Sequence, residues 1–183
     1  MNQSDALIDS YIPPPPEIDL TNTQRSFLTP KRIARISIFV ALSAVGAMMK
    51  IPSPTGTVAL DSCMGYFSAA AFGYPEGALV AALGHLLTAF TTGFPLGLPI
   101  HLYIAIQMAC WVMAFRFFAT RIHLTIGVIV GTLLNGVASA YLIVPFGGIG
   151  LAAALVVPLT IGSFVNVAIA AAAYSVVRKS NLV

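Results

Sequence analysis

Long apolar stretches with almost no charged residues dominate the chain beyond about residue 35, and they constrain the fold more than any other feature. The whole chain is 58% hydrophobic and only 8% charged, whereas soluble globular domains carry about 25% charged residues. A chain with so few charges has too little polar surface to cover a shell that faces water. The sequence therefore predicts an integral membrane protein.

Proline and glycine clusters divide the apolar part into six segments. Because a helix rises about 1.5 Å per residue, roughly 20 apolar residues cross a bilayer core. We therefore expect residues 31–183 to form an all-α bundle of six transmembrane helices, with a kink at Pro158 in the last one. The second and third segments are short and would span the membrane only as parts of the bundle. The six ranges are about 35–49, 58–72, 77–92, 100–118, 122–144 and 151–177.

Basic residues lie on one side of this six-span arrangement. With both termini in the cytoplasm, eight Lys and Arg residues fall inside, and Lys50 alone falls outside. This asymmetry follows the positive-inside rule, so the sequence predicts two cytoplasmic termini and an even number of spans. The inside set is Arg25, Lys31, Arg32, Arg35, Arg116, Arg121, Arg178 and Lys179.

The first 30 residues differ in composition from the rest. They are polar and include four consecutive prolines at positions 13–16, which favour an extended backbone without internal hydrogen bonds. They also lack the apolar stretch of a secretory signal peptide. We expect residues 1–30 to form a disordered cytoplasmic leader.

Three irregular loops, residues 51–56, 93–99 and 145–150, fall on the outer side and are rich in proline and glycine. Irregular backbone near a membrane is tolerated where protein covers it or where it lines an aqueous cavity. The loops therefore favour a ligand pocket that opens outward. The alternative is that they are ordinary turns, which need Pro and Gly in any case.

Polar residues inside the apolar segments are candidates for ligand contacts, because such residues usually face the interior of a bundle. His85, Gln107, Asn135 and Asn166 lie in four different segments at a similar expected depth. A ligand site accounts for this coincidence. Hydrogen bonds between helices are the competing interpretation.

The outer mouth of the expected pocket carries a second candidate set. Lys50 is the only outer cation and Asp61 the only outer acid, and they could pair with each other or with a ligand. Tyr66, Phe94 and His101 could stack on a flat ligand ring, although aromatic belts are also common at membrane interfaces. Substrate contacts are therefore expected from the mouth set and the buried set together.

Several functional signatures are absent from the sequence. It has no Walker A motif, no Gly-x-Ser-x-Gly elbow and no cluster with metal-ligand spacing, so we expect no catalytic residues, no metal and no cofactor in this chain. The basic residues are scattered singly or in pairs, which argues against nucleic-acid binding. Cys63 and Cys110 lie in apolar segments and are interpreted as reduced packing residues.

Residues 30–178 resemble the substrate-binding S components of energy-coupling factor (ECF) vitamin transporters. The likeness rests on size, six apolar segments, cytoplasmic ends, and a basic start to the first segment followed by small residues. Family members often carry Ala-x-x-x-Ala there to contact the coupling subunit, and Ser37 and Ala41 stand in the equivalent places. The stretch from Lys50 to Asp61 resembles the family's first outer loop, which helps to close the binding site.

The resemblance implies a multi-pass protein of a prokaryotic plasma membrane that captures a vitamin from outside the cell. A coupling transmembrane subunit and two ATPase subunits would be its partners within the lipid bilayer, and the ATPases would use the ATP. Residues 65–101, with Gly84-His85 and the loop from Phe94 to Gly97, are most similar to S components assigned to cobalamin or its α-ribazole part. Cobalamin (vitamin B12) or a cobalamin precursor is therefore the expected ligand.

Two other classes of function stay open on the residues alone. A stand-alone small-molecule carrier would transport without ATPase partners. A membrane-embedded enzyme would need His85 or Asp61 for catalysis.

Overall fold

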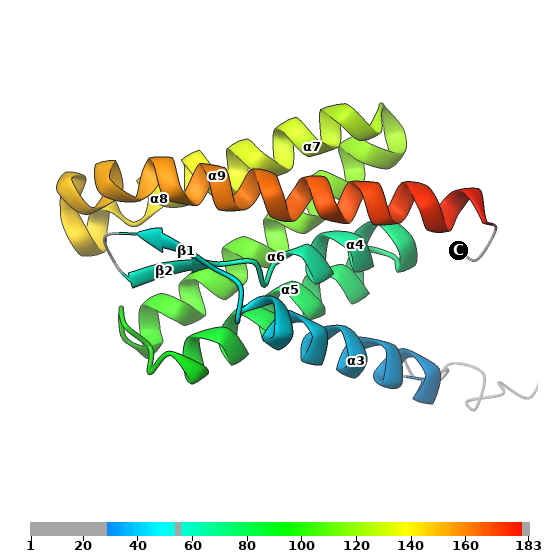
Figure 1. Ribbon diagram of the computed structural model, residues 1–183, viewed down its shortest axis with the longest axis horizontal. Coiled ribbons are helices and arrows are strands. Elements are labelled where there is room, and N and C mark those ends of the chain that lie inside the picture. The colour runs from blue at the N-terminus through cyan, green and yellow to red at the C-terminus, as the bar shows by residue number, and fades with distance from the viewer. Residues whose placement is uncertain (1–28, 54–55, 181–183) are drawn as a thin grey trace, which may run out of the picture. The chain divides into compact units, whose positions relative to one another are not determined.

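The computed structural model describes residues 29–53 and 56–180, with the side chains of residues 50–58 left undescribed. Residues 31–183 form one compact unit, and the expected leader lies outside the described residues. The described chain contains helices and one two-stranded sheet (Figure 1). In chain order the elements are α3 (Pro30–Gly46), β1 (Lys50–Ser53), β2 (Gly56–Ala59), α4 (Cys63–Phe72), α5 (Tyr74–Thr91), α6 (Leu98–Arg121), α7 (Leu124–Thr132), the π-helix η1 (Leu133–Ala138), α8 (Ser139–Leu142) and α9 (Val144–Lys179).

The expectation of a helical membrane protein is confirmed. Three helical stretches of the described chain are long and apolar enough to cross a membrane: Leu98–Arg121, Leu124–Leu142 and Val144–Lys179. The second of these combines α7, η1 and α8. Helices α3, α4 and α5 are shorter, so the number of spans stays a prediction.

The second apolar segment was expected to be helical from about residue 58, and this boundary is wrong. Residues 56–59 form β2, which pairs antiparallel with β1 in a register that joins Lys50 to Ala59 and Ser53 to Gly56. The helix begins only at Cys63. Hydropathy alone does not separate strand from helix here, and the β-branched Thr57 and Val58 favour a strand.

The expected break at residues 145–150 is a single kink within α9. Pro145 lies in the first turn of that helix, where its missing N–H has no helical partner in any case. Gly148 has a φ of 73°, a conformation that glycine adopts without steric cost. The non-helical dihedral angles of α9 are at Gly148, so a kink lies there. Pro158 lies inside the helix, and the kink expected at it stays a prediction.

Small residues bring the helices close together. A Cβ atom added to Gly65 on α4 would lie 2.7 Å from the Ala81 Cβ on α5, and one added to Gly127 on α7 would lie 2.6 Å from the Ala119 Cβ on α6. Such close approach is how helices associate where water supplies no hydrophobic force. Gly127 and Gly131 are four residues apart in α7, and the role of Gly127 is explained by packing inside this chain.

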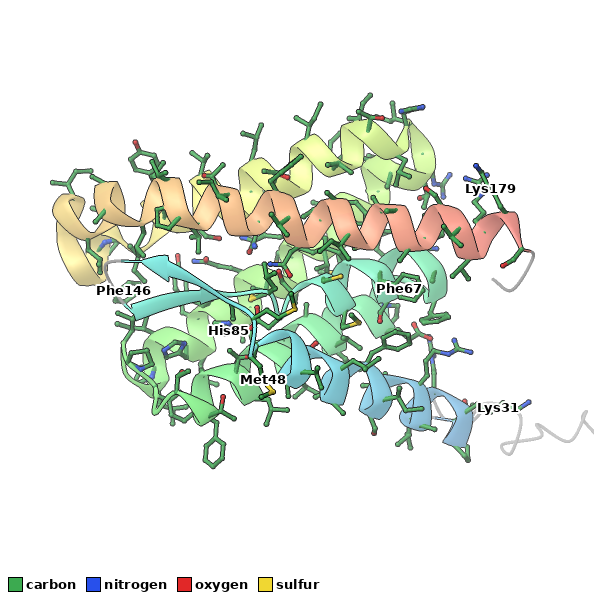
Figure 2. The ribbon with its side chains drawn as sticks, in the orientation of Figure 1. Lys31, Met48, Phe67, His85, Phe146 and Lys179 are labelled. Atoms are coloured by element: carbon green, nitrogen blue, oxygen red, sulfur yellow. The ribbon has the colours of Figure 1, made fainter. Side chains whose placement is uncertain are left out.

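The two ends of the bundle differ in what they carry. Lys31 and Lys179 lie at one end, and Phe146 lies at the other (Figure 2). The β1–β2 hairpin and the start of α9 are at the Phe146 end, whereas the α4–α5 turn is at the lysine end (Figure 1). The proline- and glycine-rich connections are thus grouped together, away from the basic residues.

Candidate functional site

A cavity of about 180 Å³ lies among the end of β2, the two residues that precede α4, and α5, α6, η1, α8 and α9. The structure brings together there five residues that the sequence nominated for substrate binding. The five are Asp61, His85, His101, Asn135 and Asn166. The remaining wall is mostly apolar and comes from Ala47, Ala59, Ala89, Pro95, Leu96, Ile104, Met108, Ile143, Leu155 and Leu159.

Two histidines form a pair at one wall of the cavity. The Nε2 atom of His85 lies 3.2 Å from the Nδ1 atom of His101, and the ring centroids are 5.3 Å apart. The backbone N–H of Leu96 donates to His101 Nε2 at 3.5 Å. Because a neutral imidazole has one donor and one acceptor, this arrangement assigns the His101 proton to Nδ1, which donates to His85. The Nδ1–H of His85 is then left to serve as a donor.

Phe94 supports this pair rather than lining the cavity. Its ring makes an edge contact with His101 at a centroid distance of 5.7 Å. Phe94 has a φ of 50°, between two glycines that also have positive φ, Gly93 and Gly97. A bulky residue in this backbone region is uncommon and marks a turn or local strain, so the loop is shaped to hold the ring against His101.

Asn166 on α9 is committed to the backbone around it. Its Oδ1 accepts from the Cys63 N–H at 2.8 Å. Its Nδ2 donates to the carbonyl oxygens of Gly162 at 2.9 Å and Ala59 at 3.3 Å. Both amide protons are therefore used. Asn166 acts as a clamp that ties the start of α4 and the end of β2 to α9, and it positions Asp61 between them.

Asn135 lies in the π-helix η1 and also lines the cavity. Its Nδ2 donates to the Ser163 hydroxyl at 2.9 Å. Among the described residues, no hydrogen-bond partner is found for its Oδ1. Short π-helices interrupt α-helices mainly at functional sites, and here the wider turn lies next to the cavity. The same π-helix contains Gly136, whose added Cβ would lie 2.6 Å from the Cα of Thr160.

Asp61 is buried, with 8% of its surface exposed. It lies between β2 and the start of α4, and its carboxylate interacts with the Thr88 hydroxyl on α5. Burial of a carboxylate is unfavourable unless partners compensate it. The backbone N–H groups of Asp61 and Ser62 also interact with this carboxylate, so Asp61 is an acidic group of the cavity wall with partners inside the chain.

The structure places Tyr66 and Gln107 outside the cavity lining, and the nomination of Lys50 stays a prediction. Tyr66 is 1% exposed in the hydrophobic core, where its ring packs edge-on against Phe115. Gln107 is buried on α6, and its Oε1 has no partner among the described residues. Lys50 contributes backbone to β1, and its side chain is outside the described part. Tyr66 was expected at the outer mouth of the pocket because its position was inferred from chain order alone.

Several polar lining residues were missed in the sequence because serine and threonine are common in membrane helices. A spacing signal was present: Asn135 and Ser139 are four residues apart, and so share a helix face. The Ser139 hydroxyl also accepts from Trp111 Nε1 at 2.8 Å, which ties α6 to α8. The missed polar lining residues are Ser62, Thr88, Thr92, Ser139 and Ser163.

Metal binding finds no support in the described residues, among which no group of three or more His, Cys, Asp and Glu side chains is placed to hold an ion. Both cysteines are free thiols, Cys63 buried and Cys110 exposed.

Comparison with protein families decides the class. The family model for "ECF transporter, substrate-specific component" matches residues 31–178, which is most of the chain. The chain belongs to this family. No curated protein matches it. A solved structure described as "Structure and mechanism of the S component of a bacterial ECF transporter" has a similar fold, with a TM-score of 0.61 and 17% sequence identity. The match covers 83% of this chain and 95% of that chain.

Membership defines the general role of the S component. Proteins of this family bind a transport substrate in the membrane and work with an ECF module of transmembrane and ATPase subunits. The chain is therefore a transport protein and not an enzyme. The likeness to the solved S component, at this identity, supports the fold alone.

Proposed function

We propose that this S component captures a cobalamin precursor, of about the size of a heteroaromatic nucleoside such as α-ribazole, for import across the plasma membrane. The observation that carries the proposal is the cavity, with its paired histidine rings, apolar wall and few polar groups. Small-molecule sites are generally mostly apolar, with a small number of placed polar groups that orient the ligand.

Cavity size favours the precursor over cobalamin itself. Ligand pockets commonly measure about 300–1,000 Å³, and this one measures about 180 Å³. A corrin ring with its amide side chains is far larger than such a space. A flat base with an attached ribose is much closer in size, and its ring can lie against His85 and the apolar wall.

Calorimetric titration of the full chain in detergent tests the proposal. The ligands are α-ribazole, cobinamide, cobalamin and a panel of other B vitamins. We expect saturable 1:1 binding that is tightest for α-ribazole. Tighter binding of cobalamin would mean that the cavity opens to admit the corrin, and tight binding of another vitamin would replace the ligand. Silence over the whole panel from folded protein would contradict the proposal.

We propose that the coupling subunit docks on the outer face of α3, at Ser37 and Ala41. Both side chains are exposed on α3, whereas Ser43 on the same helix is buried. Ala41→Trp should lower the yield of the complex co-purified with the ECF module several-fold and leave calorimetric ligand binding near normal. Cys110→Trp, at an exposed site on α6, is a matched control for an added ring facing lipid. Equal complex yields for both variants would contradict this docking face.

A further inference from the structure

The polar groups of the cavity differ in how far their hydrogen-bonding capacity is already used. Asn166 spends both amide protons on backbone carbonyls. The Ser139 hydroxyl accepts from Trp111 and donates to the Leu134 carbonyl. The Thr92 hydroxyl is bonded within its own helix. These three groups shape the cavity and have little capacity left for a ligand.

The capacity that remains includes two acceptors, on Asp61 and Asn135. In its ionised form the Asp61 carboxylate can only accept hydrogen bonds, and it lines the cavity. The Oδ1 atom of Asn135 is the second acceptor, and of the two amide protons of Asn135 one is donated to Ser163. The Nδ1–H of His85 is a donor, because the contacts of His101 with Leu96 and His85 assign the His85 proton to Nδ1.

No basic side chain is found in the lining that the described residues provide. Within this described lining Asp61 faces no cation, and the one acidic side chain of the wall is its carboxyl group. The Thr88 hydroxyl and the backbone N–H groups of Asp61 and Ser62 interact with this carboxylate and offset part of the cost of burying it, and a ligand that donates to it offsets more. An anionic ligand would place a second negative charge in the same low-dielectric space, where repulsion is much stronger than in water.

From this distribution, and on the basis of the proposed function, we infer that the cavity selects a neutral or cationic ligand that presents N–H or O–H donors to Asp61 and Asn135, and that it rejects anionic ligands. The same distribution suits a ligand with a ring nitrogen that accepts from His85 and with hydroxyl groups that donate to Asp61 and Asn135. Vitamins with a carboxylate or a phosphate are thereby excluded as substrates.

A matched pair of ligands tests the charge rule directly. Binding of α-ribazole and of α-ribazole 5′-phosphate to the full chain in detergent is compared by calorimetry, together with cationic thiamine and anionic pantothenate. We expect the phosphate to bind at least about a hundredfold more weakly than α-ribazole. Equal or tighter binding of the phosphate, or pantothenate as the tightest ligand, would overturn the inference.

Variants of Asp61 connect the selectivity to one group. Asp61→Asn should weaken the best ligand of the panel about tenfold to a hundredfold, in line with loss of a charged hydrogen bond, and should narrow the gap between α-ribazole and its phosphate. Asp61→Glu keeps the charge and should retain most of the discrimination. Unchanged selectivity in Asp61→Asn, with an unaltered thermal unfolding temperature, would overturn the inference.

Two control variants accompany those of Asp61. Thr120→Val removes an exposed hydroxyl bonded to the Arg116 carbonyl at the far end of α6 and should leave binding unchanged. Lys50→Met tests the cation of β1, and this variant should still discriminate against the phosphate.

The ligand panel separates the two proposals. If thiamine binds and α-ribazole does not, the rejection of anions is supported and the cobalamin precursor is contradicted. If pantothenate binds, the S-component function stands and the charge rule falls. Silence over the whole panel from folded protein overturns both.

Discussion

The two ends of the bundle use polar residues in opposite ways. At one end, which we call the basic end, Arg32, Glu76 and Arg116 are bound to partners within the chain. At the other, the cavity end, Asp61 and Asn135 line the cavity, and no partner for the Asn135 Oδ1 is found among the described residues. The polar groups named at the basic end thus hold helices together, whereas at the cavity end some, such as Asn166, do so and others, such as Asn135, keep capacity for a ligand.

The basic end is built around the turn between α4 and α5. Arg32 on α3 pairs with Glu76 through Nε and Oε1 at 2.6 Å and through Nη2 and Oε2 at 3.1 Å. Arg116 on α6 donates to the carbonyl oxygens of Ala69 and Ala70, the latter at 2.7 Å. Those carbonyls lie in the last turn of α4, where helix carbonyls lack helical partners. Two arginines therefore fasten one turn to two other helices.

The cavity end is built from irregular backbone. It contains the hairpin, the positive φ values of Gly93, Phe94 and Gly97, the π-helix and the kink at Gly148. Asn166 crosses from α9 to hold the hairpin and α4 in place. Comparison of the two ends shows that hydropathy and charge count describe the basic end well, and that the cavity end depends on backbone geometry.

The largest effect is expected from Asn166→Leu, because it removes the clamp on which the geometry of the cavity end depends. The Cys63 N–H and the Ala59 carbonyl would be left buried without their partner, at about 1–3 kcal/mol each. We expect a clear fall in thermal unfolding temperature together with loss of ligand binding by calorimetry. Ser175→Ala is the matched control, since that hydroxyl bonds only within α9. Retained affinity would contradict the positioning role.

His85→Leu and Asn135→Leu should act on binding more than on stability, because each removes one polar group from the cavity wall. We expect ligand dissociation constants to rise about tenfold for each, consistent with a lost hydrogen bond of about 1–1.5 kcal/mol. Unaltered dissociation constants by calorimetry for both variants would remove these side chains from the site and weaken the contrast between the two ends.

Glu76→Gln should act on stability alone and in a pH-dependent way. The hydrogen bond from Arg32 lowers the pKa of Glu76, which lies in the turn outside the expected membrane spans. A lowered folded-state pKa stabilises the fold above the unfolded value of about 4.3, and that stability is lost as pH falls through the folded value. The wild-type advantage in unfolding temperature over Glu76→Gln should be present at pH 7 and shrink below about pH 4.3. A gap that does not change with pH would contradict this ion pair.

The smallest effect is expected from Tyr66→Phe. The phenol oxygen lies 3.4 Å from the Gly131 carbonyl, so the variant loses one weak hydrogen bond in the core. We expect a stability loss of at most about 1 kcal/mol and an affinity within about twofold of wild type. A large loss of affinity would move Tyr66 from the core to the binding site and reverse its assignment.

Composition and charge determined the class of this protein and the number of its main helical segments. The low charge content and the spaced apolar runs can be satisfied only by helices in a membrane-like environment, since every backbone polar group must then be paired internally. The nomination of His85, Asn135 and Asn166 followed from the same physics, because polar residues in apolar helices face the interior.

Tertiary structure alone decided which of these residues share a wall and how each is used. Hydropathy does not distinguish the strand at Val58 from a helix, and it does not locate the kink at Gly148. Nor does it separate Asn166, whose amide protons are spent on backbone carbonyls, from Asn135, which lines the cavity with one amide proton donated to Ser163. Hydrogen-bond capacity depends on neighbours brought together from distant parts of the chain, and that is information that local sequence does not carry.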